Sequence, residues 1–233
     1  MEILSIQVGL PLSLGRLDAA DPMDRVWTTG FFKEPVAGPV WLGQTNLAGD
    51  GQADLQNHGG REKAVNIYPS EHYPYWETEL GIARLPRGAF GENFTTAGLL
   101  EAAVCIGDVF EIGRALVQVS QPRQPCWKLA RRWRVKDLAL RVQETGRTGW
   151  YFRVLRQGTV EAGERLVLVD RLHPEWTVAA ANQVMHHHKA GMAAARVLSE
   201  CPALSKSWRE TLARRVATGA AASTAQRLDG PSG

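Results

Sequence analysis

The stretch CIGDVFEIGRALVQVSQPRQPCWKL, residues 105–129, carries much of the information about the fold. Residues 108–112 and 115–121 are rich in Val, Ile and Phe and alternate apolar with polar side chains, as half-buried antiparallel strands do. Pro125 then suits the first position of a helix, because its missing N–H has no intrahelical acceptor there. This stretch therefore predicts two strands followed by a helix.

Similar strand-like segments, separated by Gly and Pro, fill the rest of the first 170 residues. The further candidate strands are residues 2–8, 25–33, 38–42, 64–68, 150–155 and 165–169. Two helical patterns interrupt them, at 70–81 and, in two pieces, from 125 to 145. We predict a mainly β fold, a β-barrel-like domain with a few helices that spans residues 1–172.

After His173-Pro174 the pattern becomes helical. Residues 176–187, 190–198 and 205–216 place Ala, Leu and Val at spacings of three and four, which predicts a small three-helix appendage over residues 173–217. Residues 218–233 offer little to bury, and we expect a disordered tail.

The 233 residues suffice for one large domain, or for one domain with a small appendage. No apolar run reaches the roughly 18–20 residues that cross a bilayer, and the first residues lack the positive charge of a signal peptide. Three widely spaced cysteines argue against a disulfide framework and favour a reducing cytoplasm. We expect a cytoplasmic protein with no membrane partner.

Charge is distributed unevenly along the chain. Residues 1–122 hold 8 Lys/Arg against 15 Asp/Glu, a net of −7, whereas residues 123–233 hold 19 against 9, a net of +10. The densest basic stretch, 123–147, suits an anionic ligand or partner, or else a solvated helix face. A nucleic-acid-binding role for the basic half and the appendage is an alternative, but an overall charge of +3 is low for it. We do not expect nucleic acid as a partner.

Cys126 is the strongest candidate for chemistry. The predicted helix start at Pro125 places it in a first turn, where unpaired backbone N–H groups favour a negative charge. Arg123 and Lys128 lie nearby, so we expect a lowered thiol pKa and a thiolate that serves as a nucleophile or a soft-metal ligand. Cys105 and Cys201 lack this setting.

A long polar loop at 50–65 is the second candidate. Its paired Gly59 and Gly60 allow a ligand to approach the backbone closely, and Lys63 offers a charge for a phosphate. Loops of this length inside compact domains are often functional. A long hairpin connection is the alternative.

Two further segments are weaker candidates for a functional site. Residues 88–95, GAFGENFT, suit a tight turn that presents side chains. Residues 146–153 carry Arg147 and Arg153, and an arginine can hold a phosphate through two parallel hydrogen bonds. A hairpin with aromatic packing explains the second segment equally well.

Together these segments resemble the MOSC family, named for the C-terminal domain of molybdenum cofactor sulfurase, and in particular its stand-alone bacterial YiiM-type branch. The matching stretches are GDGQADLQNHGGREKAV (49–65), GAFGENFT (88–95), CIGDVFEIG (105–113), QPRQPCWKL (121–129) and GRTGWYFRVL (146–155). They follow the family's order, and the predicted appendage resembles that branch's C-terminal extension. The resemblance implies a MOSC-type β-barrel-like fold that binds the molybdenum cofactor, Mo-molybdopterin.

The resemblance also implies residue roles. The sulfur of Cys126 matches the family's molybdenum ligand, and Asp54 and His58 are the nearest titratable candidates for proton delivery. The residues that it places near the cofactor are His58, Gly59, Gly60, Lys63, Phe90, Gly91, Glu92, Asn93, Arg123, Cys126, Arg147 and Arg153.

The activity implied is two-electron reduction of N-hydroxylated compounds, such as hydroxylaminopurines, which would detoxify mutagenic base analogues. Some relatives carry a fused flavin and iron–sulfur module, but its motifs are missing after residue 170. We therefore expect a separate reductase as electron donor, docking at the basic surface of residues 131–136. The alternative is a sulfur carrier with a persulfide on Cys126.

Overall fold

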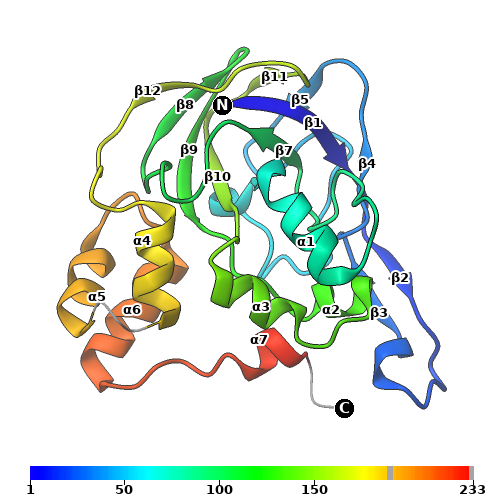
Figure 1. Ribbon diagram of the computed structural model, residues 1–233. Helices are drawn as coiled ribbons and strands as arrows, with labels where there is room; N and C mark the ends of the chain where they lie inside the picture. Colours follow the sequence, from blue (N-terminus) through cyan, green and yellow to red (C-terminus); the bar gives the residue numbers. More distant parts are fainter. Residues whose placement is uncertain (188–190, 231–233) are drawn as a thin grey trace.

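A curved eight-stranded sheet forms the body of the molecule in the computed structural model, which describes residues 1–187 and 191–230. The strand order is β12-β8-β9-β10-β6-β7-β1-β4, with β6 and β7 parallel and the other neighbours antiparallel (Figure 1). The strands of this sheet are β1 (Glu2–Val8), β4 (Glu34–Pro35), β6 (Val65–Pro69), β7 (Phe94–Ala97), β8 (Val109–Ile112), β9 (Ala115–Pro122), β10 (Trp150–Arg156) and β12 (Val167–Asp170).

The sheet curls towards closure. The segment before β12 bonds to β1 near the other end of the strand order, through Ile3 N–H to Glu164 O at 3.0 Å and Leu166 N–H to Met1 O at 2.9 Å. Two small sheets flank it, β5 (Val40–Leu42) with β11 (Gly158–Val160), and β2 (Leu12–Leu14) with β3 (Trp27–Thr29). The predicted β-barrel-like domain with a helical appendage is confirmed.

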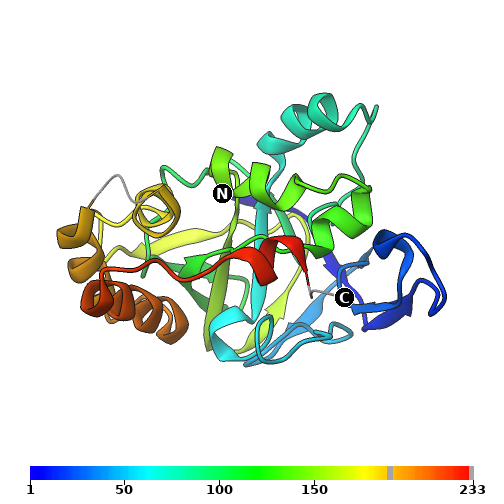
Figure 2. The same ribbon diagram turned by 90° about the horizontal axis from the view of Figure 1, so that it is seen from below.

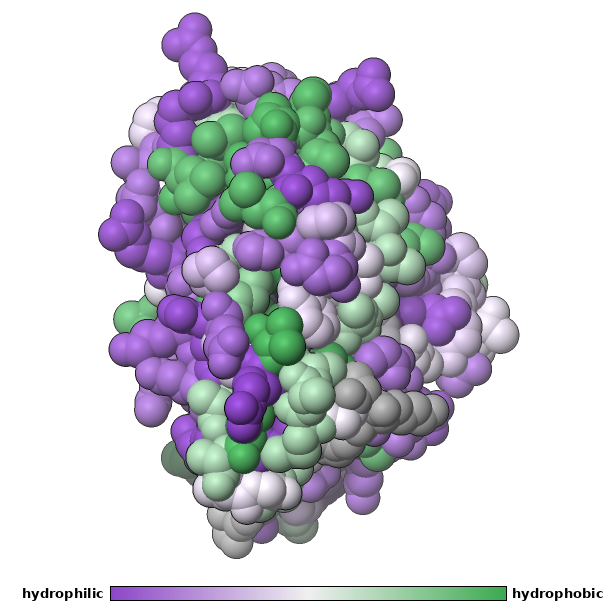
Figure 3. All heavy atoms as spheres, turned by 90° about the vertical axis from the view of Figure 1, so that its left-hand side faces the viewer, coloured by the Kyte–Doolittle hydropathy of each residue, from purple (hydrophilic) through white to green (hydrophobic). Residues whose placement is uncertain are grey.

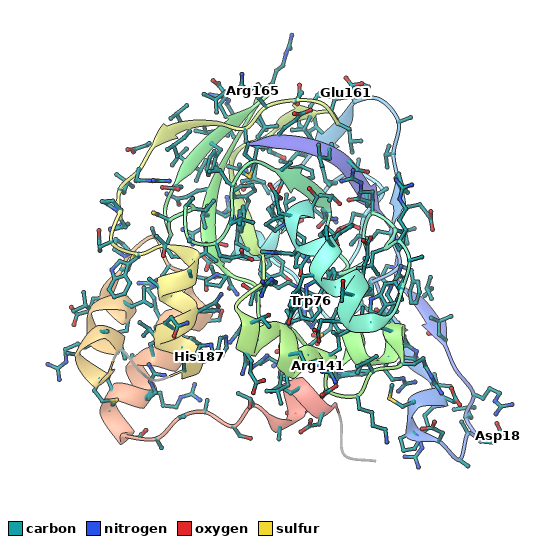
Figure 4. All side chains as sticks on the ribbon, in the orientation of Figure 1. Asp18, Trp76, Arg141, Glu161, Arg165 and His187 are labelled. Carbon is teal, nitrogen blue, oxygen red and sulfur yellow. The ribbon has the colours of Figure 1, made fainter. Side chains whose placement is uncertain are left out.

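Three helices cover the lower part of the barrel, α1 (Tyr73–Leu80), α2 (Lys128–Trp133) and α3 (Leu138–Thr145). Helix α1 joins the parallel strands β6 and β7, which need a crossover connection. It ends at Gly81, whose φ of 65° suits a residue without a Cβ. An apolar cluster around Trp76, a residue labelled in Figure 4, packs these helices together. The Trp76 indole N–H donates to the Tyr68 hydroxyl at 2.6 Å.

The predicted appendage contains α4 (Val178–Asn182), extended by a π-helical turn at Gln183–His187, then α5 (Gly191–Glu200) and α6 (Lys206–Thr218). Its Leu198, Trp208 and Leu212 belong to the same apolar core as the inner face of the sheet. Ala190, the predicted start of the second appendage helix, lies outside the described residues. The boundary at residue 172 stays a prediction.

The C-terminal segment differs from our expectation of a disordered tail. Its described part, up to residue 230, crosses the underside of the molecule and forms α7 (Ala225–Asp229) beside α2 and α3 (Figure 2). Leu228 is 9% exposed and joins the cluster around Trp76. Burial of Leu228 holds the segment against the helices, although the segment has few other apolar side chains to bury.

Several short strands went unpredicted, namely β2, β4, β7 and β11, and the predicted strand at 25–33 contracts to Trp27–Thr29. Strands of two to four residues hold too few positions for an alternating pattern to stand out. Asp18 lies at the tip of the β2–β3 arm (Figure 4).

Strand β12 has one sheet neighbour, β8, and all four of its residues are exposed. Its Val167, Leu168 and Val169 are exposed apolar side chains. Figure 3 views the molecule from the side on which Figure 1 draws β12, and it shows an apolar area in the upper part of that face. Among the described residues, no helix combines the length and apolar character needed to span a membrane.

Candidate active site

Cys126 lies between the end of β9 and the start of α2. We predicted a helix start at Pro125, but α2 begins at Lys128, because the chain is still tied to the sheet by the Arg123 N–H, which donates to Gly149 O at 3.1 Å. Cys126 therefore precedes the helix instead of lying in its first turn. The helix still contributes one amide, the Lys128 N–H, which hydrogen-bonds to the thiol.

The thiol of Cys126 is 6% exposed, and the surrounding groups favour its ionised form. Burial raises its pKa, but the hydrogen bond and charge of His58, the charge of Arg123 and the Lys128 amide outweigh burial and lower the pKa to about 7. The direction of this pKa shift is the one expected from the sequence. The main cause is a histidine 68 positions earlier in the chain, which only the fold brings into contact.

Cys126 borders a cleft that is partly open to solvent. We call it the main cleft. Its lining residues are Thr29, Gly30, Phe31, Lys33, Gly51, Gln52, Ala53, Asp54, His58, Lys63, Asn66, Phe90, Gly91, Asn93, Arg123, Cys126, Lys128 and Tyr151.

Strand register places a row of polar residues at the main cleft. Tyr151 of β10 pairs with Asn66 of β6 on one side and with Gln121 of β9 on the other. Asn93, just before β7, donates its N–H to Asn66 O at 2.8 Å and extends the row. We did not predict Asn66, Gln121 or Tyr151, although an Asn and a Gln inside otherwise apolar strands are a signal that could have found two of them.

A buried ion pair forms another wall of the main cleft. Lys33 contacts Asp50, and the side chains are 5% and 0% exposed. Asp50 also accepts from the Gly9 N–H at 3.0 Å and from the Asn93 side-chain amide at 2.9 Å. Burial lowers the pKa of Lys33, partly offset by Asp50. This pair leaves no signal in the sequence, since the two residues are 17 positions apart and lie on different segments.

Polar atoms without partners mark the same region. Within the described residues, Arg123 Nη1, Asn66 Oδ1 and Gln121 Oε1 are buried and make no hydrogen bond. Arg123 is 5% exposed and also interacts with Tyr151. Because an unpaired buried donor costs free energy, a free guanidinium nitrogen beside the cleft indicates a place for an anionic ligand.

A second pocket meets the main cleft at Cys126. The residues that line it are Asp54, Gln56, Asn57, His58, Lys63, Gln121, Gln124, Cys126, Trp127, Tyr151, Ser207, Thr211, Gln226 and Arg227. They come from the barrel, from α6 and from α7. We call this the second pocket, and the thiol can be approached from either side.

The predicted polar loop supplies Asp54, His58 and Lys63, which line both the main cleft and the second pocket. Asp54 accepts from the Asn57 backbone and side-chain amides at 3.0 and 2.9 Å. Burial raises the pKa of Asp54, but these bonds and the charge of His58 outweigh it and lower the pKa. His58 donates its backbone N–H to Asp54 O at 2.9 Å, so the two candidates for proton delivery lie next to each other in the loop.

Lys63 reaches the Asn57 carbonyl at 2.6 Å and lines both spaces, while burial lowers its pKa. Gly60, with a φ of 90°, starts the helical turn that places Lys63 there, and a Cβ on Gly59 would meet Leu55 at 2.9 Å. The two glycines shape the loop, and neither lines the main cleft or the second pocket.

In the turn at 88–95, Phe90, Gly91 and Asn93 line the main cleft, as expected. Glu92 instead lies behind them. It is fully buried and accepts hydrogen bonds from Tyr73, Thr95 and the backbone amides of residues 88 and 90. Glu92 therefore shapes the turn instead of facing a ligand.

Arg147 and Arg153, expected near a cofactor, lie elsewhere. Arg147 stacks over the Tyr75 ring at 4.0 Å. Arg153 pairs with Glu62 at 3.2 Å and donates to Ala203 O at 2.9 Å, which ties β10 to the appendage. The sequence alone does not show that these two arginines bind other parts of the chain instead of a ligand.

The basic stretch is largely engaged within the molecule. Arg134 pairs with Asp24 at 2.6 Å, and Arg131 donates to the Arg25 carbonyl and lies over the Trp27 ring at 5.2 Å. The proposed docking surface for a reductase at 131–136 therefore carries less free charge than the sequence suggests, and docking there stays a prediction.

Comparison with known proteins identifies the family. A model of the MOSC domain matches residues 54–167, and a model of the YiiM-like 3-alpha helix domain matches residues 176–219. YiiM of Escherichia coli is 39% identical over 204 residues, covering 85% of this chain and 89% of its own. The chain belongs to the MOSC family and to its YiiM-type branch.

Other similar proteins agree. YflK of Bacillus subtilis is 49% identical over 207 residues, 88% of this MOSC chain and 93% of its own. The crystal structure of YiiM from Geobacillus stearothermophilus superposes with a TM-score of 0.76 at 42% identity and covers 92% of this chain and 98% of its own. A reductase of Gibberella moniliformis is 36% identical over 184 residues, but these are 76% of this chain and 31% of that protein.

MOSC domains are generally associated with the molybdenum cofactor, and the residues present fit such a group. The main cleft combines a buried thiol with a pKa near 7, the unpartnered Arg123 Nη1 and the Lys63 ammonium, whereas Lys33 is already paired with Asp50. A thiolate suits a soft-ligand-accepting metal, and the cations suit a phosphate. Within the described residues no group of three His, Cys, Asp or Glu could hold a metal ion.

Proposed function

We propose that this protein is a molybdenum-cofactor-dependent reductase of N-hydroxylated compounds, with hydroxylaminopurines among its substrates. The observation that carries the proposal is the buried Cys126 thiol, which lies between the main cleft and the second pocket and whose pKa His58 and Arg123 lower to about 7. Membership of the YiiM-type branch and the similarity to a protein named reductase support it.

The residues divide into three tasks. Cys126 would ligate the metal, which supplies two-electron oxygen-atom chemistry when bound. Arg123 and Lys63 would hold the cofactor's phosphate by charge-assisted hydrogen bonds. The second pocket, rich in side-chain amides, would hold the substrate next to the thiol.

His58 would handle protons. Reduction of an N-hydroxyl group to an amine and water consumes two electrons and two protons. His58 hydrogen-bonds to the Cys126 thiol and lines both spaces, so a proton on its ring lies next to the place where water leaves. Electrons would come from a separate reductase.

The test begins with protein from a host able to make the cofactor. Molybdenum and pterin are measured in the wild type and in Cys126→Ala, and reduction of 6-hydroxylaminopurine is followed with a small chemical reductant. We expect near-stoichiometric molybdenum and turnover in the wild type, both sharply reduced in the variant. Wild-type protein without molybdenum and without turnover would contradict the proposal.

The same samples test the sulfur-carrier alternative, which the low thiol pKa also suits. Intact-protein mass spectrometry would then show a mass increase of about one sulfur atom, lost on treatment with a reductant. That result in metal-free protein, together with its absence in Cys126→Ala, would favour a persulfide carrier.

A further inference from the structure

The C-terminal segment, residues 219–230, returns to the loop that carries Cys126. After α6 ends, it crosses below the barrel and places α7 against α2 and α3 (Figure 2). Leu228 packs into the cluster that includes Leu129 and Val142. Gly230 lies against the Trp127 ring so closely that a Cβ would be 3.2 Å from it.

One residue of this segment holds the backbone on both sides of Cys126. Arg227 Nη1 donates to the carbonyl of Pro125, and the carbonyl of Arg227 accepts from the Trp127 N–H at 2.8 Å. The other end of the guanidinium is anchored, because Nη2 donates to Gln143 Oε1 of α3 at 2.6 Å. The two peptide units that orient the Cys126 side chain are thus bonded to a residue about 100 positions later.

The same segment closes one side of the second pocket. Gln226 and Arg227 line this pocket together with Cys126 and His58. Without α7, the pocket would lose a wall next to the thiol. The segment thus affects both how the thiol is held and what reaches it.

We propose that Arg227 is a positioning residue for Cys126 and that α7 is a strap that restricts access to the thiol from the second pocket. This inference goes beyond the reductase activity, because it concerns the thiol whatever group binds there. A merely space-filling α7 is the alternative, in which Arg227 would be replaceable without local effect.

The test measures alkylation of each cysteine in the full chain, produced in a host that cannot make the cofactor. At pH 9 the Cys126 thiol is ionised, and peptide mass spectrometry follows the three cysteines separately. In Arg227→Ala we expect Cys126 to react about tenfold faster with iodoacetamide, because two hydrogen bonds of a charged group are lost. The buried Cys105 and Cys201 should keep their wild-type rates.

The matched control is Arg214→Ala, which removes an exposed arginine of α6 and should leave all three rates unchanged. An unchanged Cys126 rate in Arg227→Ala would overturn the proposal. So would a parallel rise at all three cysteines, which would indicate general loosening. If Arg227→Ala does not fold, Arg227→Lys keeps the charge but reaches one acceptor, and a Cys126 rate equal to wild type there would overturn the proposal. Neither result depends on whether the protein binds molybdenum.

Discussion

Cys126 and Cys105 are both buried, at 6% and 2% exposed, but their surroundings act on the thiol in opposite directions. Around Cys126, His58 and Arg123 outweigh burial and lower the pKa to about 7. Around Cys105, burial and the charge of Asp108 raise the pKa, against a smaller opposing effect of Arg171.

The contrast shows that burial does not decide the chemistry of a thiol. A cysteine in a dry site stays protonated unless positive charges and donors face it. Arg171 donates hydrogen bonds to the Asp108 carboxylate at 2.7 and 2.9 Å, whereas the Nη1 of Arg123 has no hydrogen-bond partner in the described part of the chain. Four substitutions can sharpen or break this contrast.

The largest effect is expected from Cys126→Ala. Loss of groups that merely support a metal ligand typically costs about 10- to 100-fold in activity, so loss of the proposed ligand itself should exceed about 100-fold. Turnover of a hydroxylaminopurine with a chemical reductant measures it. The control, Cys105→Ala, should retain activity within about twofold, and an equal loss in both variants would break the contrast.

Arg123→Met should weaken anion binding by about 10- to 100-fold, because it removes charge-assisted hydrogen bonds from the main cleft. Titration calorimetry with inorganic pyrophosphate measures the change in affinity. Arg147→Met is the matched control, since Arg147 lies over Tyr75 and away from the cleft. Equal weakening by both substitutions would show that the anion binds elsewhere.

The pH dependence of alkylation tests the pKa contrast directly. Cys126 should reach half of its maximal rate near pH 7, falling about tenfold per unit at lower pH as the thiol is protonated. His58→Gln should move this midpoint up towards the ordinary value of 9, because it removes the group that favours the thiolate most. Cys105 should remain largely protonated at pH 8 in both proteins. A midpoint that stays near 7 in His58→Gln would assign the effect to other groups.

Asp108→Asn is expected to have the smallest effect on the site. It weakens a buried interaction with Arg171 and should cost about 1–3 kcal/mol of the free energy of unfolding, measured in urea. The Cys126 midpoint should not change. A shift at Cys126 would mean that the two thiol environments are coupled through the sheet.

Much of the fold could be predicted because its long strands carry their own pattern. Residues 2–8 and 115–121 were predicted almost to the residue, as β1 and β9 show. The segment 88–95 has the residues of a turn, but its end forms β7. The sequence does not reveal that β7 pairs in parallel with β6, because α1 separates the two strands along the chain.

The site was predicted in part. Local sequence singled out Cys126, Arg123 and Lys63, the family resemblance added His58, and the fold gathers all four around one cleft. It could not separate them from Arg147 and Arg153, because an arginine in a glycine-rich segment looks the same whether it faces a ligand, Tyr75 or Glu62.

By itself, the sequence determined the strand and helix periodicities, the helical character after residue 173 and the presence of a cysteine among basic residues. These are local properties, since the hydrophobic pattern and nearby charge depend on residues close in the chain. Tertiary structure decided the rest. It brought His58 to the thiol, paired Lys33 with Asp50 and returned Arg227 to Pro125. These contacts join residues 17 to 102 positions apart. They form because the packing of the apolar core buries these polar groups next to one another, and buried polar groups need hydrogen-bond partners.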